Sequence, residues 1–216
     1  MLFRSGVEVK GGAKLQHIED LKVSASSSFT ATDFEGTLTS NVITPTYAEH
    51  GFHVFNSRVA LIGCDTELNR GAGLRIESTA PNSNRCRYDV TTRDNGMAGV
   101  YISGSSDNIS VIEAFFQSTP EFGPTFHSEN DANIRNWNMR IYAEDGVSGA
   151  SAVSSGVVDQ VYIGKTLACN FNIYSENTNA SVQEIRMGAN TAKTIIISDR
   201  ANKDNDDGTE LSNIWL

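Results

Sequence analysis

The sequence repeats one pattern three times, as Gly51-Phe52-His53-Val54, Gly73-Leu74-Arg75-Ile76 and Gly99-Val100-Tyr101-Ile102. In each segment a glycine is followed by an apolar, a polar and an apolar residue, which is the alternation of a β-strand with one buried face. The glycines are 22 and 26 residues apart. Because repeats of roughly 20–50 residues are typical of solenoids, the segments predict strands that stack at equivalent positions of successive coils.

Further short apolar segments extend this pattern along the chain. They are rich in β-branched and aromatic residues and are separated by the turn-forming residues Gly, Asn, Asp, Ser and Thr. Their residue ranges are 59–62, 100–102, 109–112, 139–142, 171–174 and 195–197. A second series of equivalent strand positions is expected at Ile62, Val90, Ile112, Ile141, Ile173 and Ile197. Only Leu15, Ile18 and Leu21 suggest a helix, of one or two turns.

These patterns predict an all-β chain that forms a single-stranded right-handed parallel β-helix, a solenoid of about eight coils. Residues 1–216 are expected to form one domain, with a short lead-in over 1–20 and a capping tail over 201–216. Extra loops are expected at 115–124 and 146–156, and the apolar tail is expected to pack over the last coil or against another subunit. The coils are expected to start near Gly6, Phe29, Gly51, Gly73, Gly99, Phe126, Val158 and Val182.

The composition argues against two classes of protein, nucleic-acid binders and membrane-spanning proteins. The 216 residues carry 26 acidic and 17 basic side chains and a net charge of −9, without the basic stripe of a nucleic-acid binder. No apolar run approaches the ~20 residues of a membrane span. The residues from Met1 to Gly6 lack the apolar core of a signal peptide, so a protein that works outside the cell must leave it by lysis, in a particle or by a route that this chain does not show. The three cysteines suggest neither disulfides nor zinc, and we expect no cofactor and no metal.

The glycine-led strands and the Asn-, Ser- and Gly-rich turns resemble the pectate-lyase-like parallel β-helix superfamily, and within it the phage tail-spike and tail-fibre proteins. The resemblance covers roughly residues 5–200. It implies polysaccharide cleavage, receptor binding or a structural role in a homotrimeric virion fibre, and the fold does not choose among these. The catalytic signatures of polygalacturonases and the calcium-binding carboxylates of pectate lyases are not matched.

Four carboxylates are candidate catalytic residues, because glycoside cleavage commonly uses a pair of them. Asp65 and Glu67 are expected on one face of a strand, and Glu67, Asp94 and Glu113 are expected to form a ladder across neighbouring coils. A solvated face of an acidic protein is the simpler interpretation of the same pattern.

Five further residues are candidates for carbohydrate binding. Tyr101, Tyr142 and Tyr174 flank apolar strand positions and are expected to face outward, where rings stack on sugars. Glu144 and Glu176 occupy matching places in the two most similar strands. A trimer interface or an aromatic ladder in the core would use the same tyrosines.

Together with this resemblance, the sequence predicts a virion or extracellular protein of a phage that binds a host surface glycan, in a receptor-binding or structural role. The expected partners are a bacterial surface polysaccharide, two further copies of the chain in a homotrimer and other virion proteins, with no nucleic acid and no membrane insertion. The alternative is a polysaccharide lyase or glycoside hydrolase that uses the surface carboxylates.

Overall fold

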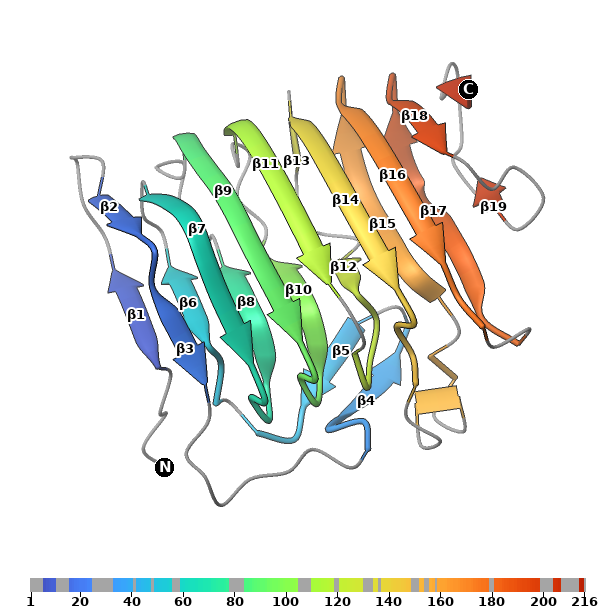
Figure 1. Ribbon diagram of the computed structural model, residues 1–216. Coiled ribbons are helices and arrows are strands. Elements are labelled where there is room, and N and C mark those ends of the chain that lie inside the picture. The colour runs from blue at the N-terminus through green and yellow to red at the C-terminus, as the bar shows by residue number, and fades with distance from the viewer. Residues whose placement is uncertain are drawn as a thin grey trace.

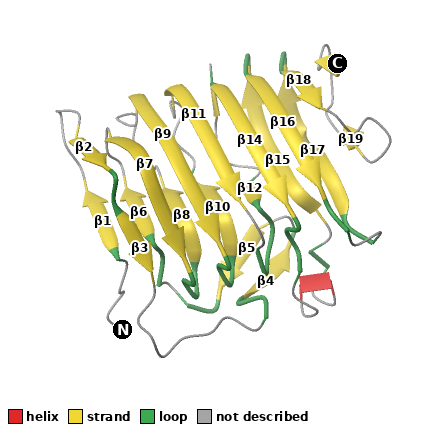
Figure 2. Ribbon diagram, in the orientation of Figure 1, coloured by secondary structure: helices red, strands yellow, loops and turns green. Residues whose placement is uncertain are grey.

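The computed structural model describes residues 6–10, 16–24, 33–40, 42–47, 49–55, 59–77, 84–104, 110–118, 121–129, 134–135, 137–148, 152–153, 156–157, 159–178, 181–198, 204–206 and 214–215. For residues 16, 84, 85, 110–118, 184, 204–206 and 214–215 the description covers the backbone alone. Strands dominate the described part of the chain, and a short helical segment lies at residues 152–153 (Figure 2). None of the described helical residues forms a helix long and apolar enough to cross a membrane.

Two parallel sheets form the molecule (Figure 1). The first sheet has the order β1 (Val7–Lys10), β6 (Phe52–Phe55), β8 (Ala72–Glu77), β10 (Ala98–Ser103), β12 (Phe126–Ser128), β15 (Asp159–Leu167), β17 (Gln183–Ala192) and β19 (Asp204–Asp206), with β13 (Ile134–Arg135) paired to β15. The second sheet has the order β2 (Gln16–Glu19), β7 (Val59–Glu67), β9 (Asn84–Arg93), β11 (Ser110–Ser118), β14 (Asn138–Glu144), β16 (Asn170–Glu176), β18 (Ile195–Ser198) and β20 (Ile214–Trp215), with β3 (Lys22–Ser24) paired to β7.

The chain passes back and forth between the two sheets, so that strands consecutive in the sequence mostly lie in different sheets and strands paired in one sheet are about one repeat apart. Figure 1 draws the second sheet in front of the first, with both running across the molecule from the N-terminal to the C-terminal side. All pairings within the two sheets are parallel. The expected all-β class with parallel strands is therefore confirmed.

The two sheets share one apolar core, to which each contributes alternate residues of its strands. Along the first sheet the buried positions align in register as one row: Phe52, Leu74, Val100, Phe126, Val161 and Ile185. The facing row of the second sheet includes Met139, Phe171 and Ile196. These rows bury apolar surface that no single strand could bury by itself.

The glycine-led strands align as the sequence predicts. Phe52 pairs with Leu74 and Leu74 with Val100, which places Gly51, Gly73 and Gly99 side by side at the start of their strands. Gly51 is required there, because a Cβ atom would overlap the Thr66 hydroxyl and lie 2.6 Å from the Gly73 carbonyl oxygen. Seven of the eight expected coil starts fall within one residue of a strand of the first sheet.

The expected coil start near Phe29 is wrong. Phe29 lies outside the described residues, but β1 pairs directly with β6, so no strand of the first sheet comes between them. The intervening chain instead contains an antiparallel hairpin, β4 (Gly36–Thr39) and β5 (Val42–Pro45). This hairpin packs Phe34 and Ile43 into a second apolar cluster on the outer side of the first sheet, together with Ala72, Met97, Ala98, Tyr101, Val147, Ala152, Val157 and Val182.

Several local expectations also differ from the structure. The suggested helical turns near Ile18 are instead strands β2 and β3. The loop expected at 115–124 is shorter, because β11 continues to Ser118. In the second series only Ile141 and Ile173 are in register; Val90 pairs with Cys64 and Ile197 with Asn172. The apolar tail contributes β20, which pairs with β18.

Candidate functional site

Asp65 and Glu67 lie on the outward side of β7, as the alternation predicts. Glu67 forms ion pairs with Lys22 Nζ at 2.8 Å and with Arg93 Nη2 at 3.3 Å. The hydrogen bond from Lys22 is the main cause that lowers the pKa of Glu67. A carboxylate held in its ionised form is a poor general acid, and its lowered pKa also makes it a weaker base, so Glu67 is suited to a structural ion pair.

The expected ladder of Glu67, Asp94 and Glu113 does not form. Glu67 is in register with Arg93, whereas Glu113 is in register with Arg87. These two arginines are separated by about 20 Å along β9, at ~3.3 Å per residue. Glu113 therefore lies far from the other two carboxylates.

Asp94 stays near Glu67. It follows β9 with a left-handed φ of 53°. Burial is the main cause that raises the pKa of Asp94, and the charge of Glu67 raises it further. The structure thus brings Asp65, Glu67 and Asp94 to one end of β7 and β9, but two cations already neutralise Glu67 there.

Tyr101 is 2% exposed, so the expectation that its ring is available to a sugar on the outer surface is wrong. Its side chain does lie on the outer side of β10, but the β4–β5 hairpin covers it. The hydroxyl lies 2.9 Å from the Ile43 carbonyl oxygen and also contacts the buried carboxyl group of Glu129, so its single proton has two acceptors beside it. Tyr101 is therefore part of the packing beneath the hairpin.

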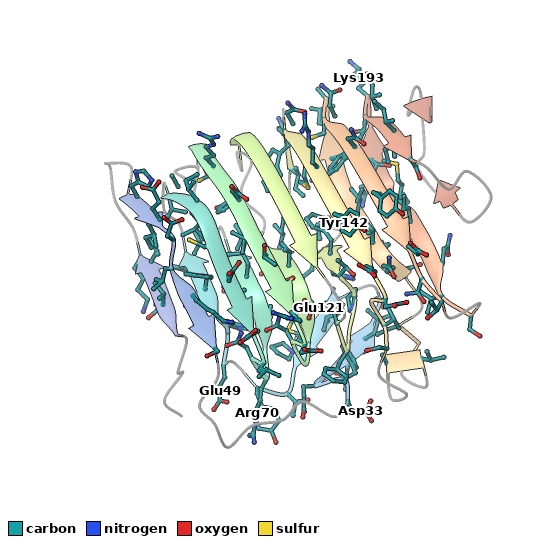
Figure 3. The ribbon with its side chains drawn as sticks, viewed as in Figure 1. Asp33, Glu49, Arg70, Glu121, Tyr142 and Lys193 are labelled. Carbon is teal, nitrogen blue, oxygen red and sulfur yellow. The ribbon has the colours of Figure 1, made fainter. Side chains whose placement is uncertain are left out.

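Tyr142 and Tyr174 form a stacked pair on the outer side of the second sheet. They are in register on β14 and β16, with ring centroids 4.7 Å apart and ring planes within 4° of parallel. Tyr174 is 38% exposed, and Figure 3 shows Tyr142 on the same front sheet. Each ring covers one face of the other, and the exposed part of Tyr174 is available to a ligand.

Glu144 and Glu176 flank this pair and are also in register, as the sequence predicts. The Tyr174 hydroxyl donates to Glu176 Oε2 at 3.3 Å. We call the outward side chains of β14 and β16 the Tyr142–Tyr174 surface; its members are Asn138, Arg140, Tyr142, Glu144, Asn170, Asn172, Tyr174 and Glu176. In Figure 1 no described strand or helix crosses in front of β14 and β16. The surface combines aromatic rings with amide, carboxylate and guanidinium groups, which suits sugar hydroxyls.

A second group of ionisable side chains was not identified from the sequence. On the outer side of the first sheet, His53 Nε2 lies 3.3 Å from Glu77 Oε2, and His53 Nδ1 lies 3.9 Å from Glu8 Oε1. Arg75 Nη2 lies 3.1 Å from the same Glu77 oxygen. The signal was present in the sequence, because His53 and Arg75 are the polar positions of two glycine-led strands and pair in register.

His50 joins this group from the turn before β6. Two residues three positions apart on one strand point to opposite faces, but the ring centroids of His50 and His53 are 5.6 Å apart, because His50 precedes the strand. Burial, followed by the charge of Arg75, lowers the pKa of His50 to about 3. The same two causes lower the pKa of His53, and Glu77 opposes them. Both imidazoles are therefore neutral at pH 7.

Metal binding finds no support in the part of the chain that the structure describes, where no three His, Cys, Asp or Glu side chains are placed to hold an ion. The cysteines Cys64, Cys86 and Cys169 are buried thiols that form no disulfide. In comparisons with known proteins, no family model, no curated protein and no solved structure matches the chain.

Proposed function

We propose that the two parallel sheets are walls of a single right-handed parallel β-helix, and that this solenoid binds a bacterial surface glycan as a virion protein of the tail-spike or tail-fibre type. The alternation of the chain between the sheets supports the solenoid, since each strand pairs with a strand about one repeat away. Right-handed crossovers between parallel strands are the general rule, which gives the hand.

The Tyr142–Tyr174 surface is the observation that carries the glycan-binding proposal. A sheet face that no described strand or helix crosses (Figure 1), an exposed tyrosine and a row of amides and carboxylates provide stacking and hydrogen bonding at once. A rigid sheet fixes these groups in place, so little side-chain freedom is lost when a ligand binds.

Binding of the full-length protein to an array of bacterial surface oligosaccharides tests this proposal. Tyr174→Ala is expected to weaken binding about 30-fold, the effect of losing ~2 kcal/mol from an aromatic contact. Tyr47→Ala is the matched control, because Tyr47 is equally exposed, at 38%, but lies beside Arg70 outside this surface. Equal losses in both variants, or no bound glycan at all, would overturn the proposal.

The proposed homotrimer has its own test. Multi-angle light scattering at several concentrations is expected to give a trimer whose mass does not change on dilution. A monomer that persists at all concentrations would remove the fibre and spike roles, and glycan binding would then belong to a free-standing module.

Polysaccharide cleavage is the second candidate function. The contacts of His53 make it a better candidate for the catalytic residue than the carboxylates near Glu67. The neutral imidazole of His53 is oriented by Glu77 and lies close to Arg75. It is therefore suited to act as a general base beside a cation. The measurement is the size of a bacterial polysaccharide after incubation with the protein. Loss of cleavage in His53→Asn, but not in the double variant Glu67→Gln/Asp94→Asn, would assign the chemistry to His53; the reverse result would assign it to the carboxylates.

A further inference from the structure

The chemistry of the Tyr142–Tyr174 surface narrows the kind of glycan that fits it. Its outward residues form rows across the strands, because equivalent positions of β14, β16 and β18 are in register. Asn138 pairs with Asn170 and Asn170 with Ile195; Arg140 pairs with Asn172 and Asn172 with Ile197. Neighbouring strands lie about 4.8 Å apart, so a chain lying across them meets a new side chain at each strand.

Charge disfavours an acidic ligand. The aromatic pair is flanked by the carboxylates of Glu144 and Glu176, and Arg140 is the single cation among the outward residues of the described strands β14, β16 and β18. Ionised carboxylates only accept hydrogen bonds, so they require hydroxyl or amide N–H donors from the ligand. A uronate or phosphate group would face two like charges and one opposite charge.

Apolar groups lie next to these amides. Ile195 is 36% exposed and Ile197 is 47% exposed, and each is paired with an asparagine of β16. An asparagine amide beside an exposed isoleucine matches an acetamido group, because the ligand amide would bond to the side-chain amide while its methyl group covers the isoleucine.

We infer that the Tyr142–Tyr174 surface, extended by Ile195 and Ile197 of β18, binds an uncharged glycan that carries N-acetyl groups. This inference rests on the proposed function, since it names the ligand class of the same site. The acetamido groups lie over the rows of Asn170 and Asn172, and the sugar hydroxyls donate to Glu144 and Glu176. Arg140 donates to carbonyl or ring oxygens.

The test uses an array with three classes of bacterial oligosaccharide: uncharged with N-acetyl groups, uncharged without them, and uronate-containing. The first class is expected to bind most tightly. Burial of one methyl group contributes about a fourfold gain in affinity. Ile197→Thr is expected to reduce this preference. Because the Ile197 side chain is 47% exposed and supports no core packing, the reduction reports the contact with the ligand and not a loss of folding.

The outcomes separate the inference from the proposed function. If uronate-containing or unacetylated glycans bind as well as acetylated ones, and Tyr174→Ala still weakens binding, the surface binds glycans but the inferred ligand class is wrong. If none of the three classes binds, the inference and the proposed function both fail. If Ile197→Thr leaves the preference unchanged, the acetamido group is not held where we place it.

Discussion

Acidification is expected to destabilise the fold through His50, whose side chain is buried at 1% exposure. Its Nδ1 accepts a hydrogen bond from the Ala72 backbone N–H at 2.9 Å, and its Nε2 lies 3.1 Å from Arg75 Nη1. Both ring nitrogens thus face donors, and a neutral imidazole has only one nitrogen that accepts. Protonation removes that acceptor and adds a second positive charge beside Arg75.

The magnitude follows from the pKa of His50, which is lowered from 6.5 to about 3. Because the folded-state pKa is below the unfolded one, the unfolded chain takes up this proton first as the pH falls. The contribution of His50 to stability is therefore complete above pH ~6.5 and is lost as the pH falls toward 3. Between pH 8 and pH 5 the expected loss is about 2 kcal/mol, which is a large fraction of a typical 5–15 kcal/mol stability.

Urea denaturation at pH 8, 6.5 and 5 measures this loss, with His50→Asn as the matched variant. Asparagine keeps an oxygen acceptor for the Ala72 N–H but does not titrate, so the titration of other groups is common to both proteins. The difference in unfolding free energy between wild type and variant should change by about 2 kcal/mol from pH 8 to pH 5. An unchanged difference, or an NMR titration of His50 near its ordinary pKa, would refute the reasoning.

Three further substitutions test the packing. Gly51→Ala is expected to cost about 3 kcal/mol or more in urea denaturation, because the new methyl overlaps the Thr66 hydroxyl; wild-type stability would exclude the close approach. Phe171→Ala, in the core at 1% exposure, is expected to cost about 3–5 kcal/mol, and a smaller loss would mean that the core collapses around the site. Gln160→Leu is expected to cost about 1–3 kcal/mol by leaving the Gly146 N–H without its acceptor, and faster hydrogen exchange at that amide checks the cause.

The glycine-led strands could be aligned from the sequence because two constraints act on them together. Alternation fixes which residues enter the core, and the close approach at Gly51 admits no side chain. A shift of one residue would violate both. The second series had only the alternation, which does not fix the partner of a residue. Its register failed at the bulge between Leu61 and Cys64, and at Ile197, which is one residue out of register with Ile173 in a pairing without a bulge.

The hairpin β4–β5 could not be distinguished from another coil. Its strands have the same alternating β-prone composition as the strands of the parallel sheets. What makes it a covering element is the packing of Phe34 and Ile43 against the outer side of the first sheet, which is a contact between distant parts of the chain. The exposure of Tyr101 failed for the same reason, since alternation gives the side of the strand on which a residue lies but not what covers that side.

The two outer faces consequently differ in what a ligand would have to displace. On the first sheet one row in register runs through His53, Arg75, Tyr101, His127 and Tyr162. His127 stacks between the two tyrosines, with ring centroids 5.8 Å and 4.9 Å away. A ligand that reached the centre of this row would have to expose Phe34 and Ile43, each of which loses roughly 1.5–3 kcal/mol on exposure.

The second sheet demands no such displacement around Tyr174, which is already exposed beside Asn172. A ligand that binds there loses no binding free energy to the displacement of packed side chains. Binding at the centre of the first row would first disrupt the second apolar cluster. At the His53 end of that row Glu8 and Glu77 remain partly exposed, so that end is open to substrate. This asymmetry is why we place glycan binding on the second sheet and would look for cleavage, if the protein has it, at His53.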